Sequence, residues 1–247
     1  MASSISGGKS IIRDGLVFYI DAANPRSYPY TSSGPLWKDL SKNLYDGANS
    51  LSPTYSSTYQ GNISYNGTSN YTTFPTNIGV NGLATATFCF WIYIYTNQTI
   101  PFINRYDTNS GSLNVDFIGT QPGTTKPFAR CLLGTLNNRT DWISNTELVN
   151  LNTWNHVVFT INNPSSSVSL YFNNQSKDLT ATTVGTGAGS TINVSSTTPW
   201  TLARGVGVSG SPVYSQITIS NIAVYNRVLT VDEIDQNYNV GRYRFGL

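Results

Sequence analysis

The clearest alternation of apolar and polar side chains, with a period of two, lies in residues 152–174. This period predicts β-strands with one face toward a core and a mixed opposite face. Residues 162–165, Asn-Asn-Pro-Ser, separate two such arms and provide turn chemistry, because Asn accepts positive φ angles and proline lacks a hydrogen-bond donor. The segment is therefore predicted to be a β-hairpin, with its apolar face formed by Val157, Phe159, Ile161, Val168, Leu170 and Phe172.

Three more segments of the N-terminal half carry strand patterns. Residues 15–22 predict a strand near the N-terminus. Residues 85–95 have bulky side chains on both faces, which predicts a central strand. Within residues 53–71 a strand precedes Asn66-Gly67, a dipeptide typical of tight hairpin turns.

The other strand patterns are shorter or interrupted. Residues 101–138 predict several short strands, and residues 180–198 are rich in Gly, Thr and Ser and predict a loop with one weak strand. In residues 216–226 the apolar phase shifts at Ser220 and Asn221, which predicts a β-bulge or a bend.

A helix is predicted after the last strand. Thr230 is a suitable N-cap, and Glu233 completes a capping box. Val231, Ile234 and Tyr238 form an apolar stripe at helical spacing, so we expect this helix to pack one face on the sheet.

These elements together predict an all-β fold, an antiparallel β-sandwich of jelly-roll type with one short C-terminal helix. Neither an internal repeat nor a linker divides the chain, so residues 13–247 are expected to form a single domain. Residues 1–12 are small and polar and predict a flexible arm. That arm is either a disordered tail or a tether to another subunit.

Several segments resemble the laminin-G-like domain of the concanavalin A-like lectin/glucanase superfamily. They are the strand and turn of residues 15–28, the W-K-D-L-S-K-N turn of residues 37–43, the W-x-H-V and L-Y-x-N signatures of the hairpin, and the closing run of residues 219–238. Lys42 departs from the pattern, because relatives usually carry glycine there. The opening strand is similar to that of tailed-phage virion proteins. The resemblance implies a capsid decoration protein, or a fibre or tail adhesin.

The composition narrows the choice of partners. Charged residues make up 11% of the chain, against roughly 25% in ordinary globular domains. The surface is therefore expected to be neutral and hydrogen-bonding, which suits glycans or a larger protein assembly. The net charge of +2 includes no basic run, so nucleic acid is not an expected partner.

The termini and cysteines indicate a setting outside the secretory route. Residues 1–13 have no apolar signal-peptide core, and the longest apolar run, residues 88–95, is too short to span a bilayer. If the protein works outside a cell, we expect it to leave by lysis or through a dedicated machine, and the resemblance implies a place on the virion surface. Cys89 and Cys131 are predicted to be buried thiols, with a single disulfide bridge as the alternative.

Catalysis is not expected from the residues present. Glu233 and Asp235 resemble the E-x-D-x-E core of glucanases of this fold, but position 237 is Asn and the capping box predicts a helix here. His156 is the single histidine and lacks a nucleophile motif, so it is interpreted as structural. No catalytic residue and no metal-binding cluster is predicted.

Two segments combine planar polar groups with an aromatic side chain, as sugar-binding sites do. They are residues 104–107 and 138–142, both expected in loop-like settings. The alternative is that they are ordinary loop caps and core-edge aromatics. The candidate ligand-binding residues are Asn66, Asn70, Asn104, Arg105, Asp107, Arg139, Asp141 and Trp142.

Asn66 and Asn70 stand where the resemblance implies carboxylates. Amide oxygens are weaker ligands for Ca²⁺, so no cofactor is expected, and calcium binding through backbone carbonyls stays open. The sequence favours a non-enzymatic virion protein with a carbohydrate-binding face, whose partners are virion proteins and host-surface glycans in a homo-oligomer or symmetric array. The alternatives are a polysaccharide hydrolase using Asp107 and Asp116, and a structural capsid cement without sugar binding.

Overall fold

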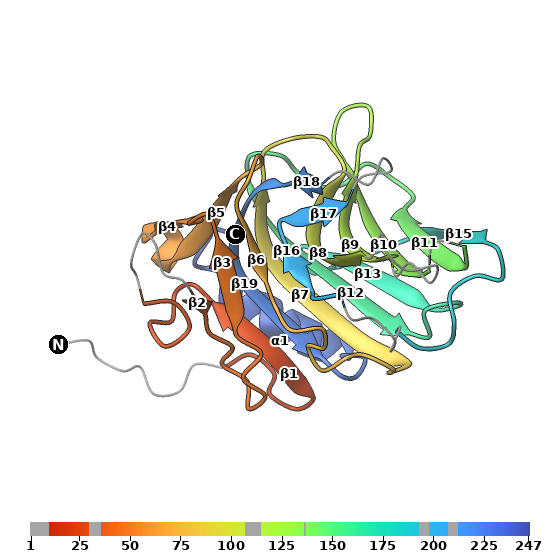
Figure 1. Ribbon diagram of the computed structural model, residues 1–247, viewed down its shortest axis with the longest axis horizontal. Coiled ribbons are helices and arrows are strands. Elements are labelled where there is room, and N and C mark those ends of the chain that lie inside the picture. The colour runs from red at the N-terminus through yellow and green to blue at the C-terminus, as the bar shows by residue number, and fades with distance from the viewer. Residues whose placement is uncertain (1–9, 30–35, 107–114, 136, 193–197, 207–211) are drawn as a thin grey trace.

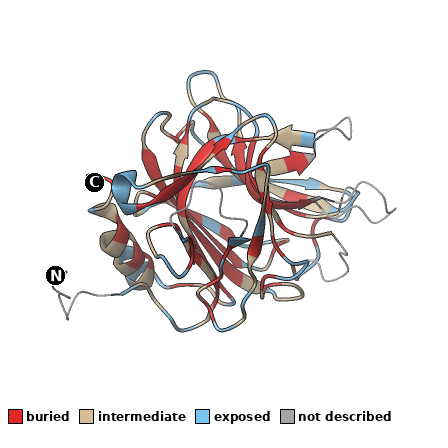
Figure 2. Ribbon diagram, turned by 60° about the vertical axis from the view of Figure 1, so that its left-hand side comes forward, coloured by how far each residue is buried: buried red, intermediate tan, exposed pale blue. Residues whose placement is uncertain are grey.

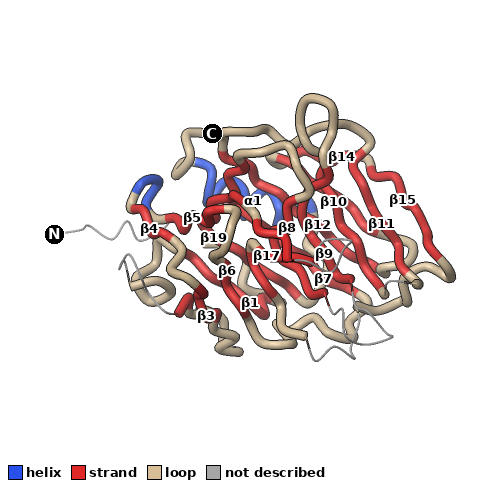
Figure 3. Tube along the Cα trace, turned by 45° about the horizontal axis from the view of Figure 1, so that its top comes forward, coloured by secondary structure: helices blue, strands red, loops and turns tan. Residues whose placement is uncertain are grey.

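Two antiparallel sheets lie face to face, and a helix lies outside one of them (Figure 1). This computed structural model describes residues 10–29, 36–106, 115–135, 137–192, 198–206 and 212–247. Strands are the main regular secondary structure of that part of the chain (Figure 3). The predicted all-β sandwich with a C-terminal helix is confirmed.

One sheet contains eight strands within the described residues, in the order β14-β13-β12-β7-β19-β5-β4. The eighth strand, β1, pairs with the half of β19 that β5 leaves free. The strands are β1 (Leu16–Asp21), β4 (Thr54–Ser56), β5 (Asn62–Asn66), β7 (Thr85–Ile94), β12 (Trp154–Asn162), β13 (Val168–Phe172), β14 (Gln175–Lys177) and β19 (Gln216–Tyr225).

The other sheet contains nine strands within the described residues, in the order β15-β11-β10-β9-β8-β16-β6-β3-β2. They are β2 (Leu36–Trp37), β3 (Gly47–Ser50), β6 (Tyr71–Thr73), β8 (Ile100–Tyr106), β9 (Val115–Gln121), β10 (Phe128–Gly134), β11 (Arg139–Ser144), β15 (Leu179–Val184) and β16 (Thr201–Leu202). The remaining elements are the paired strands β17 (Arg204–Val206) and β18 (Pro212–Tyr214), the 3₁₀-helix η1 (Thr58–Gln60) and the α-helix α1 (Val231–Arg242).

The main core fills the space between the two sheets. Phe88 and Phe90 of β7 contribute from one side, and Ile103, Ile118 and Cys131 from the other. Buried residues accordingly follow the strands of both layers (Figure 2).

The predicted hairpin is formed by β12 and β13, with Ile161 opposite Val168. Asn163 has a φ of 112°, as its place in the turn requires. The mixed face of β12 is not exposed, however, because Val158 packs under α1 and Trp154 joins an aromatic cluster. Both faces of this strand are therefore buried, one between the sheets and one beneath the C-terminal segment.

The predicted central strand and bulge are also confirmed. Strand β7 pairs with β12 on one side and β19 on the other. The register of β19 against β7 shifts between Ile219 and Asn221, where the apolar phase changes. The weak strand predicted in residues 180–198 is β15, which begins at Leu179.

The hairpin suggested by Asn66-Gly67 is not formed. Strand β5 belongs to the eight-stranded sheet and β6 to the nine-stranded sheet, so this turn carries the chain between layers. Asn66 Oδ1 accepts hydrogen bonds from the backbone N of Thr68 at 2.9 Å and of Ser69 at 3.0 Å. These bonds, with Gly67 at a φ of 74°, bend the chain away from β5.

Helix α1 has the predicted capping box of Thr230 and Glu233. The predicted apolar stripe is partly wrong, because Val231 is 60% exposed. Asn237 and Gly241 instead share the buried face with Ile234. Asn237 is tolerated there because its Oδ1 accepts from Ile12 N at 2.9 Å and its Nδ2 donates to the Tyr225 hydroxyl at 3.1 Å.

Of the predicted arm, residues 1–9 lie outside the described residues. Residues 10–12 run beside α1, since Gln236 Nε2 donates to Ser10 O at 2.8 Å and Tyr225 donates to Ile12 O at 3.0 Å. Among the described residues, this end of the arm is held to the fold by three hydrogen bonds, two of Ile12 and one of Ser10.

The edge of β1 opposite β19 is closed by the W-K-D-L-S-K-N turn. Asp39 is 4% exposed, and its carboxylate accepts from the backbone N of Tyr19, Ser41 and Tyr45, each at 2.9 Å, and from the Ser41 hydroxyl at 2.7 Å. Asn43 Nδ2 adds a bond of 2.7 Å to Val17 O. The exposed edge that a terminal strand would otherwise present is thus covered.

Both cysteines are free and buried, so the disulfide alternative is wrong. Cys89 lies under α1, on the outer face of the eight-stranded sheet. Cys131 lies in the main core, on the inner face of the nine-stranded sheet. Burial raises the pKa of the Cys89 thiol to about 12, which keeps it protonated and unreactive.

Among the described residues, α1 is not long and apolar enough to cross a membrane, and neither is any other helix.

Candidate functional site

The two segments predicted as binding loops are strands. Residues 104 and 105 lie on β8, and residues 139–142 on β11. Strand alternation therefore turns neighbouring side chains to opposite faces. Trp142 belongs to the main core, where its Nε1 donates to Pro164 O at 3.1 Å. Arg105 is fully buried with its guanidinium 4.9 Å from the centroid of the Trp200 ring.

Asn104, Arg139 and Asp141 remain on the outer face of the nine-stranded sheet. The register runs from Asp141 through Leu132 and Phe117 to Asn104. Three strand spacings separate the ends of this row, roughly 14 Å. Asn104 is 2% exposed, because β17 lies over it and Arg204 O accepts its Nδ2.

The Asp141 carboxylate is occupied by Arg130. Arg130 Nε donates to Oδ1 at 2.8 Å and Nη2 to Oδ2 at 2.5 Å, in the bidentate geometry that makes such pairs strong. The two side chains are 21% and 14% exposed. The pair orders this face of the sheet and engages both oxygens of the carboxylate. A ligand-binding role for Arg139 and Asp141 stays a prediction.

Asn66 and Asn70 serve the turn between the sheets. Asn66 N donates to Asn70 Oδ1 at 2.8 Å, and Asn70 is 4% exposed. Asp107 lies outside the described residues, and so does the side chain of Asp116. Within the described chain, no three His, Cys, Asp or Glu side chains gather as a metal-binding group.

The sequence analysis missed a row of aromatic side chains on the outer face of the eight-stranded sheet. Its ring centroids are 5.6 Å apart between Tyr59 and Trp154, 5.8 Å between Trp154 and Tyr93, and 4.9 Å between Tyr93 and Tyr95. We call Tyr59, Trp154, Tyr93 and Tyr95 the aromatic stripe. Tyr59 is 44% exposed and Tyr95 37% exposed, so the stripe ends in accessible rings.

The stripe lies where α1 and the C-terminal residues no longer cover the outer face of the eight-stranded sheet. Along one face of β7, Cys89 lies beneath α1 and Trp91 is stacked against Tyr238 and Phe245. Tyr93 and Tyr95 follow on the same face with progressively less cover. Trp154 lies on β12, directly opposite Tyr93 of β7. Its ring packs on that of Phe245, with 4.4 Å between the ring centroids.

Tyr59 is held on the stripe by strained backbone. It has a φ of 53°, and Gln60 has a φ of 66°, values that are uncommon for residues with large side chains. Arg244 supports this turn, because its Nη2 donates to Gly61 O at 3.3 Å and its Nη1 pairs with Asp21 at 3.1 Å. Such strain is frequently retained at functional sites.

Neutral hydroxyls accompany the rings. The Tyr95 hydroxyl lies 3.0 Å from Thr218 Oγ1, which lies 2.7 Å from Ser64 Oγ. Desolvation, with a further contribution from Tyr95 and Tyr59, raises the pKa of Tyr93. The Tyr93 phenol therefore stays uncharged at neutral pH. The stripe offers apolar ring faces and neutral hydrogen-bonding groups side by side, and it contains no carboxylate.

Comparison with known proteins identifies a family that the sequence of this chain matches. Residues 66–235 match a laminin-G family model described as the concanavalin A-like lectin/glucanases superfamily. None of the curated proteins compared with the chain matches it in sequence.

Several solved structures share the fold at low sequence identity. Domain 4 of AbnA, a GH43 extracellular arabinanase from Geobacillus stearothermophilus in complex with arabinotriose, matches with a TM-score of 0.60 and 16% identity, covering 92% of this chain and 100% of that one. Trypanosoma rangeli sialidase in complex with sialic acid matches with a TM-score of 0.55 and 17% identity over 93% of this chain. The chain spans 33% of that sialidase.

The receptor binding domain of botulinum neurotoxin C/D mosaic serotype gives a TM-score of 0.55 at 13% identity, over 93% of this chain and 52% of that chain. At such identities these structures share the fold alone with this protein. The family match covers most of the sandwich, from the turn after β5 into α1. The chain belongs to the concanavalin A-like lectin/glucanases superfamily.

Proposed function

We propose that this chain is a non-enzymatic carbohydrate-binding protein that holds a neutral glycan against the aromatic stripe. The observation that carries the proposal is the run of rings from Tyr59 to Tyr95 with accessible ends. A sugar ring has an apolar C–H face and polar edges. Stacking on tyrosine and hydrogen bonding to nearby hydroxyls match both features.

The superfamily supports this assignment, because two of the similar structures were solved with a saccharide bound. Those saccharides are arabinotriose in the Geobacillus domain and sialic acid in the Trypanosoma sialidase. The neurotoxin domain is named for receptor binding. The low charge of the chain, 11%, is also suited to an uncharged ligand.

Two carboxylates of the described chain, Asp141 and Glu233, are held in ion pairs, which favours binding over hydrolysis by either of them. Glycoside hydrolysis needs two carboxyl groups on either side of the bond, about 5–9.5 Å apart. Asp141 is paired with Arg130, and Glu233 caps α1 while pairing with Arg227 at 2.7 Å. The Arg227 hydrogen bond lowers the pKa of Glu233 to about 2, so it cannot serve as a general acid at neutral pH.

The proposed setting is the surface of a tailed-phage virion, as a capsid decoration, fibre or tail adhesin. This part rests on the resemblance of residues 15–28 and 37–43 to such proteins. A neutral polar surface and a glycan-binding face suit display in a symmetric array, where weak sites act together. Detection of the chain in purified virions by mass spectrometry tests this setting, and its absence there would overturn it.

Substitution of the two accessible rings tests the binding site. We expect Tyr59→Ala and Tyr95→Ala each to weaken glycan binding about tenfold, because each removes a stacking surface. Tyr59→Phe and Tyr95→Phe keep the rings and should retain most of the affinity. The measurement is calorimetric titration with a neutral glycan selected on an array.

Tyr243→Ala is the matched control, since Tyr243 is 75% exposed and lies outside the stripe. Unchanged affinity in the Tyr59→Ala/Tyr95→Ala double variant would rule out the stripe as the site. The absence of any glycan binding by the unmodified chain would instead favour a structural cement.

A further inference from the structure

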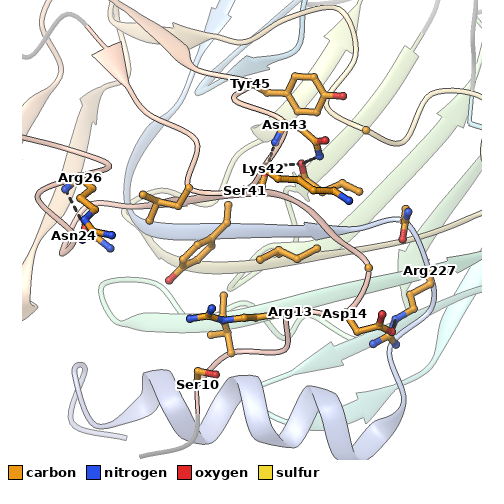
Figure 4. A pocket seen from close by; sticks show the side chains of 18 residues that line it. Ser10, Arg13, Asp14, Asn24, Arg26, Ser41, Lys42, Asn43, Tyr45 and Arg227 are labelled. Atoms are coloured by element: carbon orange, nitrogen blue, oxygen red, sulfur yellow. Dashed lines mark hydrogen bonds and ion pairs between the residues drawn. The ribbon is translucent and has the colours of Figure 1, made fainter. Parts of the chain in front are cut away.

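A cavity of about 1050 Å³ lies beside β1, remote in sequence from the stripe and sharing no residue with it. Figure 4 shows its walls, which come from residues 10–11, 13–17 and 19 at the start of the fold, from 24, 26, 40–43 and 45, and from 79, 226 and 227. Its volume is at the upper end of the range for small-molecule sites. The cavity is therefore large enough for more than a single inorganic ion.

The cavity is the basic part of a nearly neutral protein. Of the described residues, Arg13, Arg26, Lys42 and Arg227 line it, and Asp14 is the acidic residue among them. The chain has 14 Lys and Arg against 12 Asp and Glu, so this excess alone is larger than the net charge of +2. A local field of this kind attracts anions.

Three of these cations have no partner in the described structure. Arg227 is already paired, with Asp14 at 2.9 Å and Glu233 at 2.7 Å. The guanidinium groups of Arg13 and Arg26 and the amine of Lys42 make no hydrogen bond or ion pair with any described residue. They are available to an anionic ligand.

The walls between the cations are ordered by internal hydrogen bonds. Asn43 Nδ2 donates to Val17 O at 2.7 Å, and Asn24 Oδ1 accepts from Arg26 N at 3.0 Å. Gly15 has a φ of 73°, and a Cβ there would lie 2.9 Å from Arg227 Cγ. Glycine at this position thus lets Arg227 lie against the start of β1.

We propose that this cavity is a second binding site, which takes an acidic oligosaccharide with its carboxylates at Arg13, Arg26 and Lys42. Charge-assisted hydrogen bonds from guanidinium groups suit carboxylates. Asn24 Nδ2, Asn43 Oδ1 and the Tyr45 hydroxyl are not used in these internal bonds, and they can serve the sugar hydroxyls between the carboxylates. The cavity and the stripe bind independently, so either site can fail without the other.

The test is a calorimetric titration with oligogalacturonate, a carboxylate-bearing saccharide, at low and at moderate ionic strength. We expect measurable binding that weakens as salt screens the cations. The Arg13→Gln/Arg26→Gln double variant should bind more than tenfold more weakly, because it removes two charge-assisted contacts. A neutral oligosaccharide of the same length should not compete.

The matched control is Lys177→Gln/Arg242→Gln, which lowers the net charge equally at residues outside the cavity. Thermal melting of both double variants establishes that each folds. The Tyr59→Ala/Tyr95→Ala variant should keep its affinity for oligogalacturonate. An equal loss in the control pair would mean non-specific attraction and would overturn the proposal.

Two further outcomes would also overturn it. One is the absence of oligogalacturonate binding at low salt. The other is inorganic phosphate binding as tightly as the oligosaccharide and with the same sensitivity to Arg13→Gln/Arg26→Gln, which would identify a general anion site without saccharide recognition.

Discussion

Replacing Asp39 with alanine is expected to lower the free energy of unfolding by about 4 kcal/mol, since an unpaired buried donor costs about 1–3 kcal/mol. Its carboxylate accepts from the backbone N of Tyr19, Ser41 and Tyr45, and it is 4% exposed. Alanine would leave these donors without an acceptor and admit water to the edge of β1. Urea denaturation at neutral pH measures the change.

Asp39→Asn keeps one side-chain acceptor and should lose less stability than Asp39→Ala. Asp178→Ala is the control, because Asp178 is exposed on the segment between β14 and β15 and its loss should cost under about 0.5 kcal/mol. A loss below about 1 kcal/mol for Asp39→Ala would show that the turn of residues 37–43 does not depend on this carboxylate.

The stability of the protein is expected to fall by about 2 kcal/mol between pH 8 and pH 5 because of His156. Burial lowers the pKa of His156 to about 3, and its Nδ1 has no hydrogen-bond partner among the described residues. Below the ordinary value near 6.5 the unfolded chain binds a proton that the folded chain excludes, so the folded state loses stability as the pH falls.

The surroundings of His156 explain this exclusion. Its ring lies 4.7 Å from that of Trp91 on β7 and 5.5 Å from that of Tyr238 on α1, between centroids. Two carboxylates, Glu147 and Glu233, have pKa values lowered to about 2. Their contribution to folding stability is lost only as the pH falls below about 4.5, the pKa of these groups in the unfolded chain. The window from pH 8 to pH 5 therefore isolates the histidine.

The comparison is between the natural chain and His156→Phe, which keeps a ring between Trp91 and Tyr238. The variant should show a flat stability profile from pH 8 to pH 5 in urea denaturation. The same slope in both proteins would assign the pH dependence to another group.

Local patterns predicted the elements well, because their causes lie within a few residues. The alternation in residues 152–174 gave the β12–β13 hairpin, and the phase change at Ser220 gave the bulge of β19. The Thr230 capping box began α1. The same rule failed at Asn66-Gly67, since a turn sequence does not say which layer the next strand joins.

The candidate site was harder to predict, because it depends on which faces the fold leaves uncovered. Asp141 and Trp142 are adjacent in sequence but lie on opposite faces of β11. Tyr95 belongs to a strand pattern that predicts burial, yet its side chain is 37% exposed. Helix α1 and Phe245 cover the neighbouring rings of Trp91 and Trp154 but do not extend over Tyr95. Tyr59 comes from a strained turn far away in the sequence, so its place beside Trp154 is a tertiary property.

The central claim is that the chain binds glycans and leaves them intact. The most direct test is a glycan array followed by calorimetry with the selected glycan, with calcium and with chelator, and an assay for new reducing ends in the same samples. The proposed function predicts saturable binding that chelator does not abolish and a glycan recovered unchanged. The absence of binding under both conditions would contradict it. So would the appearance of new reducing ends in an amount that increases with protein concentration and with incubation time.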